Sequence, residues 1–285
     1  MLNRREFLET ALAGTVATRM GRAQGAAVPA VKAPGGVVKY VRYELGGRIS
    51  YGLLTGETIE ELRGSILSGA QPTGNRHKLA DVRLLVPCEP SKIVAAGLNY
   101  KSHVGGQPAP TKPEFFLKTL SSLLENNGKI VFPEGASNVH YEGEMVLVIG
   151  KRAKNVSIAD APNYVFGVTC GNDVSERDWQ KSDLQWWRAK SSDTFGCAGP
   201  CIAVGLNYGD LLLQTRLNGE VRQSARTSDL LYDVPTMISF ISRVMTLLPG
   251  DLVYTGTPGQ TKPMKSGDVV EVELEGVGIL RNMIA

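Results

Sequence analysis

The sequence predicts an α+β protein that holds more strand than helix and consists of two parts that meet near residue 90. Short segments alternate apolar and polar residues, as strands with one buried face do. The 32 glycines and 15 prolines, with Asn and Asp, punctuate the chain. Such punctuation favours short strands joined by turns over long helical bundles. One stretch, residues 235–247, has the spacing of a clear amphipathic helix.

Length and composition exclude several classes of protein. The chain has 285 residues, 42% hydrophobic and 21% charged, with a formal net charge of +3. These values are ordinary for a globular protein and exclude a disordered chain, a coiled coil and a strongly cationic nucleic-acid binder. The four cysteines are too few and too irregularly spaced for a disulfide scaffold or a structural zinc site, so we expect buried thiols.

The first thirty residues differ from the rest of the chain. Arg4 and Arg5 are followed by Phe7 and Leu8 and then by a run of small residues. Residues 1–30 therefore resemble a twin-arginine export leader, cleaved at a bond after Ala23 that the sequence does not fix. The apolar run is shorter than the ~18 residues that span a bilayer, so no stable membrane anchor is expected. We expect export to the periplasm, and a frayed N-terminus of a cytoplasmic protein is the alternative.

The next segment predicts a small N-terminal α+β domain over residues 35–88. Its expected elements are a hairpin at 37–54 that turns at Gly46-Gly47, a short helix at 58–67 and a strand at 82–86. Pro87 and Pro90 then interrupt the pattern, and a new strand begins at residues 93–96. The larger domain is therefore expected over residues 90–285.

The larger domain is predicted to be rich in strands. The strand candidates are residues 142–149, 164–170, 202–204, 211–217, 251–254 and 268–274. The apolar stripe of the helix at 235–247 is predicted to pack in the core.

Two glutamates at alternate positions of one apolar strand are the most informative feature. Glu142 and Glu144 point the same way on a strand and stand about 7 Å apart at their bases, so they can converge on one cation. The alternative is a solvent-facing strand edge. Asp173 follows the next apolar strand and adds a third carboxylate, and three oxygen ligands predict Mg²⁺ or Mn²⁺. His140 shares this face either as a supporting residue or as a histidine at a strand end.

Several segments of the larger domain are similar, in order, to one known family. They are VAAGLNYKSH, FFLK, YEGEMVLVIGK, GNDVSERDWQ, AKSSDTFGCAGP, LNGEVRQ and GDLVYTGTPGQ, followed by the GDVVEVELEGVGIL tail. Residues 90–285 thus resemble the fumarylacetoacetate hydrolase family. The resemblance implies a mixed β-roll or β-sandwich catalytic domain, a homodimer and a divalent metal held by Glu142, Glu144 and Asp173.

The resemblance also implies a small-molecule 2-oxo acid as substrate. It assigns His103 and Lys190 to catalysis, with Lys190 neutralising developing negative charge. It assigns Arg177, Gln180, Lys190 and Thr257 to substrate binding. Alternatives from the sequence are a surface arginine at 177 paired with Asp178 or Glu176, and a structural turn at Thr257.

One position departs from the family pattern. Many relatives carry a glutamate three residues after the histidine, whereas this chain has Gly106. Glu114 or Glu125 are possible replacements. We expect a metal-dependent enzyme that hydrolyses a carbon–carbon bond of an acylpyruvate-like substrate through an enolate. Isomerisation of 2-hydroxymuconate-type dienes or decarboxylation by the same site is the close alternative, and an exported 2-oxo-acid binding protein without turnover is a third.

Overall fold

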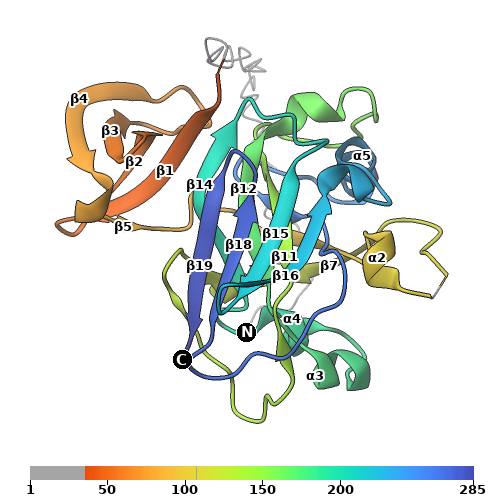
Figure 1. The fold of residues 1–285 in the computed structure, drawn as a ribbon. Helices are drawn as coiled ribbons and strands as arrows, with labels where there is room; N and C mark the ends of the chain where they lie inside the picture. Colours follow the sequence, from red (N-terminus) through yellow and green to blue (C-terminus); the bar gives the residue numbers. More distant parts are fainter. Residues whose placement is uncertain (1–35, 107) are drawn as a thin grey trace, which may run out of the picture. The chain divides into compact units, whose positions relative to one another are not determined.

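Most strands of the chain join one large sheet (Figure 1). The computed structural model describes residues 36–106 and 108–285, so the expected leader at 1–30 lies outside the described residues and stays a prediction. The main path of the sheet runs β4 (Gln71–Lys78), β3 (Thr58–Arg63), β2 (Arg48–Thr55), β1 (Val38–Leu45), β14 (Gly196–Val204), β12 (Val165–Asp173), β11 (Gly143–Ile149), β17 (Leu252–Tyr254), β6 (Ile93–Gly97) and β7 (Glu114–Lys118). β5 (Arg83–Leu84) pairs with β1, and β8 (Leu123–Leu124) pairs with β14.

A second, smaller sheet packs against the middle of the large one. Its order is β16 (Glu220–Arg226), β15 (Leu212–Leu217), β18 (Val269–Leu274), β19 (Gly278–Ile284) and β9 (Lys129–Ile130). It contacts β11, β12 and β14, and buried side chains such as Met145, Leu147, Leu213 and Val272 fill the space between the sheets. A separate pair, β10 (Val139–His140) with β13 (Ser175–Glu176), lies beside the start of β11.

Helices are few and short among the described residues. The α-helices are α2 (Lys101–Val104), α3 (Arg177–Ser182), α4 (Trp187–Ser191) and α5 (Val234–Val244), and the 3₁₀ turns are η1 (Leu79–Asp81), η2 (Leu120–Ser122), η3 (Ala161–Tyr164) and η4 (Thr227–Asp229). The Asp233 side chain caps α5 by accepting the Thr236 N–H at 2.9 Å, and the face with Met237 and Ile241 is buried. Within the described part of the chain, no helix has the length and apolar character to cross a membrane.

The sequence placed most of these elements correctly. The hairpin at 37–54, the strands of the larger domain and the helix near 235–247 are confirmed, and the four cysteines are free and buried. The result is a mostly-sheet fold with few helices.

The helix expected at 58–67 is wrong, because residues Thr58–Arg63 form strand β3. Its backbone groups pair with β2 on one side and β4 on the other, and these pairings outweigh the helical propensity of the Glu-Glu-Leu run. The elements described over residues 38–88 are therefore strands and the η1 turn, so the α component of the expected N-terminal domain is not found there. The domain boundary expected near residue 90 stays a prediction.

The buried carboxylate of Asp251 holds strand β17 in place beside β6 and β11. The Asp251 side chain accepts the Ser91 N–H at 2.9 Å, the Lys92 N–H at 3.1 Å and the Leu248 N–H at 2.7 Å. It also accepts the Ser91 hydroxyl at 2.7 Å and the Lys92 ammonium at 2.6 Å. These bonds align the parallel strands β17 and β6, so that the chain leaves β17 beside the acidic end of β11.

Asp251→Ala should lower the free energy of unfolding by about 3 kcal/mol, because bonds to a charged acceptor are strong and several donors lose their partner. Urea denaturation measures this change. Asp233→Ala is the matched control, since it removes an Asp that caps one helix and should cost only about 1 kcal/mol. Equal losses in the two variants would contradict the central role of Asp251.

Candidate active site

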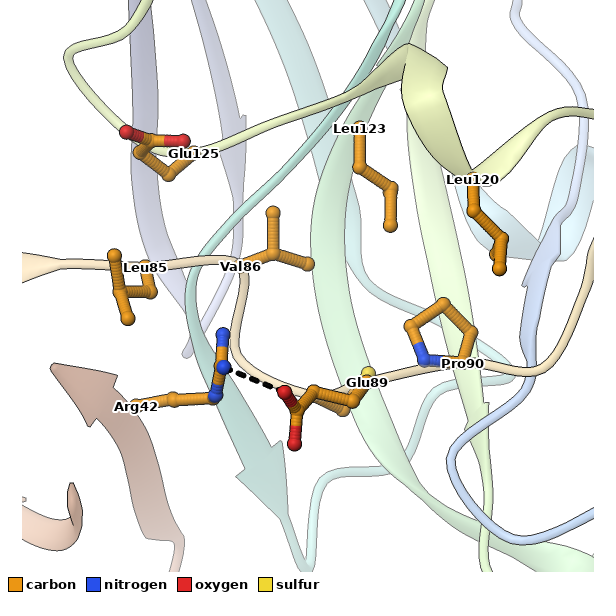
Figure 2. Close-up of a pocket in the computed structure, with 9 residues that line it drawn as sticks. Arg42, Leu85, Val86, Glu89, Pro90, Leu120, Leu123 and Glu125 are labelled. Atoms are coloured by element: carbon orange, nitrogen blue, oxygen red, sulfur yellow. Dashed lines mark hydrogen bonds and ion pairs between the residues drawn. The ribbon is translucent and has the colours of Figure 1, made fainter. Parts of the chain in front are cut away.

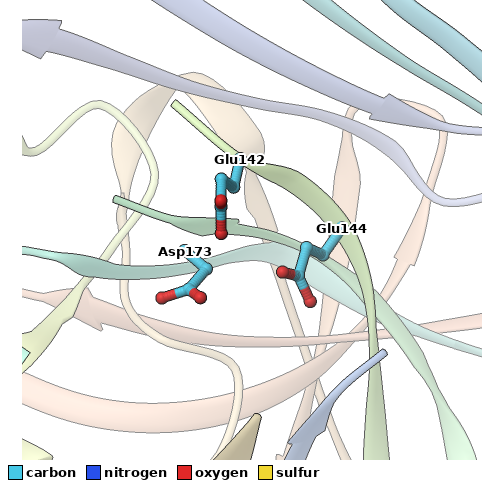
Figure 3. Close-up of side chains that lie close together, drawn as sticks. All are labelled: Glu142, Glu144 and Asp173. Carbon is cyan, nitrogen blue, oxygen red and sulfur yellow. The ribbon is translucent and has the colours of Figure 1, made fainter. Parts of the chain in front are cut away.

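Three buried carboxylates meet where β11 and β12 lie side by side (Figure 3). Glu142 immediately precedes β11, Glu144 is its second residue and Asp173 ends β12. One ligand atom from each of the three lies within 4.8 Å of the other two, and none of the residues is more than 4% exposed. The structure therefore brings together the three residues that the sequence placed at a metal, and the solvent-exposed alternative does not hold.

The glycine between the two glutamates explains their orientation. A Cβ at Gly143 would lie 1.9 Å from the Thr215 Oγ1 of the second sheet, so only glycine fits there. Side chains alternate along a strand, so the glutamates face away from the second sheet. The Asp173 N–H donates to the Glu142 carbonyl oxygen at 2.9 Å, which keeps the two residues adjacent.

Three cationic side chains surround the carboxylates. The Lys190 ammonium donates to the Glu142 carboxylate at 2.6 Å and to Asp173 at 2.8 Å. Arg177 donates to the other Glu142 oxygen at 2.5 Å. Both cations thus contact the acidic group, and the catalytic and substrate-binding roles that the resemblance implies for Lys190 and Arg177 stay predictions.

The third cation, Lys118, is a residue that the sequence analysis missed. It ends β7, is buried, and donates to Asp173 at 2.5 Å and to the Lys190 carbonyl oxygen. The signal was present in the FFLK segment, where a lysine ends an otherwise apolar strand. Lys118 fixes both a carboxylate of the acidic group and the backbone that carries Lys190.

The environment shifts the pKa values of these groups in opposite directions. Burial opposes ionisation of Glu142, but Lys190 and Arg177 outweigh it and hold the pKa of this carboxyl below its usual value. Burial raises the pKa of Glu144, and the charges of Asp173 and Glu142 raise it further. Burial lowers the pKa of Lys118, whereas for Lys190 the charges of Asp173 and Glu142 overcome burial and raise it.

The residues present fit a hard divalent cation. The cluster offers three carboxylate oxygens and contains no sulfur or imidazole donor, which matches Mg²⁺ or Mn²⁺. Glu144 accepts a bond from the Gly256 N–H at 2.7 Å, and a nearby cation would favour its ionised form. Glu142, Glu144 and Asp173 are the residues that would hold the ion.

His103, on α2, is oriented by a backbone carbonyl. Its Nδ1 lies 2.7 Å from the Gly259 carbonyl oxygen, which can only accept, so the ring proton sits on Nδ1. In the neutral ring Nε2 is then the nitrogen without a proton, and it lies 3.8 Å from a Glu142 oxygen. The Gly259 N–H donates to the Ser102 hydroxyl at 3.0 Å, so two bonds join α2 to the same turn.

The two glutamates considered as replacements for the one absent at Gly106 have other partners in this structure. Glu125 accepts from Arg83 at 2.8 Å, and Glu114 is exposed with Lys112 3.8 Å away. The partner that sets the His103 tautomer is therefore the Gly259 carbonyl, a main-chain group.

Arg177 and Gln180 act together at the start of α3. Arg177 donates to the Gln180 side-chain oxygen at 2.7 Å and to the Thr261 hydroxyl at 2.9 Å. This geometry replaces the surface ion pair that the sequence offered as an alternative. His140 contacts Thr261 at 2.8 Å, and burial, with the charge of Arg177, lowers its pKa to about 4. It supports the Arg177 side of the site through Thr261.

Thr257 uses its hydroxyl within the protein. It donates to the Gly143 carbonyl oxygen at 2.8 Å and is buried, so its single proton holds the turn against β11. The structural alternative is thus supported, and a contact of Thr257 with substrate stays a prediction.

A cavity of about 300 Å³ lies apart from the acidic group (Figure 2). Arg42 of β1 pairs with Glu89 across it at 2.7 Å, and Leu120 and Leu123 line its other side. None of the three carboxylates lines this cavity, so the chemistry described here does not belong to it.

Comparison with known proteins links both parts of the chain to described families. Residues 92–285 match the family described as "Fumarylacetoacetate (FAA) hydrolase C-terminal", and residues 38–87 match "Rv2993c-like, N-terminal". Protein Rv2993c of Mycobacterium tuberculosis is 47% identical over 74% of this chain and 82% of its own length. Oxaloacetate tautomerase FAHD2A, mitochondrial, of Bos taurus is 36% identical over 72% of this chain and 70% of its own.

Solved structures show the same fold. A 2-hydroxyhepta-2,4-diene-1,7-dioate isomerase from Mycobacterium marinum is 42% identical, with a TM-score of 0.82, over 87% of this chain and 98% of its own. A maleylpyruvate hydrolase from Sphingobium sp. SYK-6, in complex with manganese(II) ion and pyruvate, is 30% identical, with a TM-score of 0.72, over the same shares. The family match spans the three carboxylates, His103 and Lys190, and the chain belongs to the fumarylacetoacetate hydrolase family.

Proposed function

We propose that this enzyme moves a proton at the carbon next to the keto group of a 2-oxo acid, as a metal-dependent tautomerase or isomerase. The observation that carries the proposal is the position of His103, whose Nδ1 is bound to the Gly259 carbonyl while Nε2 faces the carboxylate group and is the nitrogen available as a base in the neutral ring. Proton transfer needs one such base, which removes the proton from the carbon and delivers it to the enolate oxygen or to another carbon of a conjugated substrate. This places proton transfer ahead of the hydrolysis expected from the sequence.

The side chains around His103 suit an enolate. A divalent cation held by the three carboxylates would polarise the keto oxygen and stabilise negative charge there. Lys190, buried against Glu142 and Asp173, adds a fixed positive charge near the same point. Arg177 and Gln180 lie at the edge of the group and would bind the polar end of the substrate.

The names of the relatives support this order of candidates. The Mycobacterium marinum protein is called an isomerase and the Bos taurus protein a tautomerase. The manganese(II) and pyruvate of the maleylpyruvate hydrolase support the choice of ion and a 2-oxo acid.

Carbon–carbon hydrolysis is the second candidate, because it proceeds through the same enolate and one relative is called a hydrolase. It requires an activated water in addition, and this chain has Gly106 where many relatives carry the second acid/base group. A binding protein without turnover is disfavoured, since a binder has no need of a base with a fixed tautomer.

Removal of the metal should abolish the reaction. Glu144→Gln should weaken Mn²⁺ binding by more than about 100-fold, the upper range for loss of a group that only supports a ligand. Calorimetry measures the affinity, and the ultraviolet absorbance of enol oxaloacetate follows turnover. Glu273→Gln, the same change at a partly exposed strand position, should alter neither. Full activity in chelator would contradict the mechanism.

His103→Ala should slow solvent-deuterium exchange at the carbon next to the keto group by about 10²–10⁴-fold, because the base is lost. Proton NMR of oxaloacetate or an acylpyruvate in D₂O measures the exchange. His77→Ala removes a histidine of β4 and serves as the control. Undiminished exchange in His103→Ala would remove His103 from the chemistry.

Gly106→Glu separates the two candidate reactions. If proton transfer is the native reaction, the added carboxylate should leave exchange flat or impair it while any hydrolysis of an acylpyruvate rises. A Cβ at Gly106 meets no atom within 4 Å, so Gly106→Ala tests the effect of a side chain alone. Hydrolysis by the native protein that exceeds exchange would reverse the order of the candidates.

A further inference from the structure

We propose that Gln223 is a positioning residue that holds the turn of residues 257–259, and with it His103, against the metal-binding strand β11. The inference rests on the proposed function for its kinetic consequence. Gln223 belongs to the LNGEVRQ segment, to which the reaction described above assigns no role.

The acidic end of β11 lacks a strand neighbour on one side. The ladder of β17 with β11 covers Val146–Val148, and one further backbone bond runs from the Thr255 N–H to the Met145 carbonyl at 3.1 Å. The Thr255 hydroxyl donates to the same Met145 carbonyl at 2.8 Å, and at the next step the Thr257 hydroxyl donates to the Gly143 carbonyl at 2.8 Å. The turn after β17 thus continues the sheet through side chains.

The Gln223 amide joins the turn to the strand at one point. Its Nε2 donates to the Thr257 hydroxyl at 2.8 Å and to the Pro258 carbonyl at 2.6 Å, which uses both of its hydrogens. Its Oε1 accepts the Gly143 N–H at 3.2 Å. Gln223 is 2% exposed and comes from β16, the edge strand of the second sheet.

The same turn carries the group that orients the base. Pro258, held by Gln223, is followed by Gly259, whose carbonyl accepts the His103 Nδ1–H and whose N–H binds Ser102. A loss of the Gln223 bonds frees the Pro258 carbonyl, next to Gly259, and leaves Thr257 with its own bond to the Gly143 carbonyl. The three carboxylates remain fixed by the β11–β12 ladder, which Gln223 touches through the Gly143 N–H alone.

This arrangement predicts that a change at Gln223 lowers the affinity for substrate and leaves the affinity for the metal nearly unchanged. Gln223→Glu keeps the shape of the side chain but cannot donate to Thr257 or Pro258, because an ionised carboxylate only accepts. The variant should bind Mn²⁺ within about threefold of the native affinity. Its affinity for oxalate, a dianion shaped like the enolate of a 2-oxo acid, should fall about tenfold or more in the Mn²⁺-loaded protein.

Asn282→Asp is the matched control. Asn282 is also a buried amide of the second sheet, and its Nδ2 donates to the Glu125 and Gly128 carbonyls at 2.9 and 3.0 Å. Both changes place a carboxylate against carbonyl oxygens and should lower thermal stability. The loss of oxalate affinity and a rise in KM should follow only from Gln223→Glu.

Calorimetric titration with Mn²⁺ and then oxalate measures both affinities without turnover. Gln223→Met, which is apolar and similar in length, replaces Gln223→Glu if the latter does not fold. Combining Gln223→Met with Thr257→Val should cost no more oxalate affinity than the larger single effect, because both remove the same contact.

Three results would overturn the proposal: an unchanged oxalate affinity in the Gln223 variants, an equal loss in Asn282→Asp, or no oxalate binding by the native protein. A failure of proton transfer by the native enzyme, with oxalate affinity still dependent on Gln223, would overturn the proposed function and leave the role of Gln223 standing.

Discussion

The concentration of negative charge at the ends of β11 and β12 is the constraint on which the site depends. Three carboxylates that are almost fully buried cannot all be ionised without nearby positive charge. The fold supplies this charge from three separate elements, with Lys118 from β7, Arg177 from α3 and Lys190 from α4. Segments distant in the sequence are thereby drawn to one point of the large sheet.

The structure assigns rigidity and chemistry to different parts of the chain. The carboxylates stand on paired strands and are fixed by the backbone ladder. His103, the proposed base, stands on α2, a helix of one turn, and is oriented by a turn beyond β17. A main-chain carbonyl serves the purpose that a carboxylate serves in other histidine sites, and it adds no further negative charge to an acidic region.

The sequence was sufficient where the pattern is local. Alternation identified the strands, and the Glu-Gly-Glu spacing identified the face that carries two of the three clustered carboxylates, because each signal lies within a few residues. Lys118 and Gln223 escaped notice because their partners lie far along the chain, 55 residues away for Asp173 and 34 for Thr257. The bond of His103 to the Gly259 carbonyl could not be predicted, because every residue has a main-chain carbonyl. The strand at Thr58–Arg63 was mistaken for a helix because its pairing partners, and not its composition, decide its conformation.

The pairing of β1 with β14 affects how the two family segments depend on each other. Residues Val38, Lys39 and Tyr40 cover the edge of β14 at Val204, Ala203 and Ile202, so the sheet that carries the carboxylates continues into the N-terminal strands. A chain reduced to residues 92–285 would leave that edge open, with a row of free backbone donors and acceptors beside apolar side chains. Open edges of this kind recruit strands from other molecules and lead to aggregation. By covering the edge of β14, strand β1 should protect the large sheet from self-association, and this effect requires no contact with the substrate.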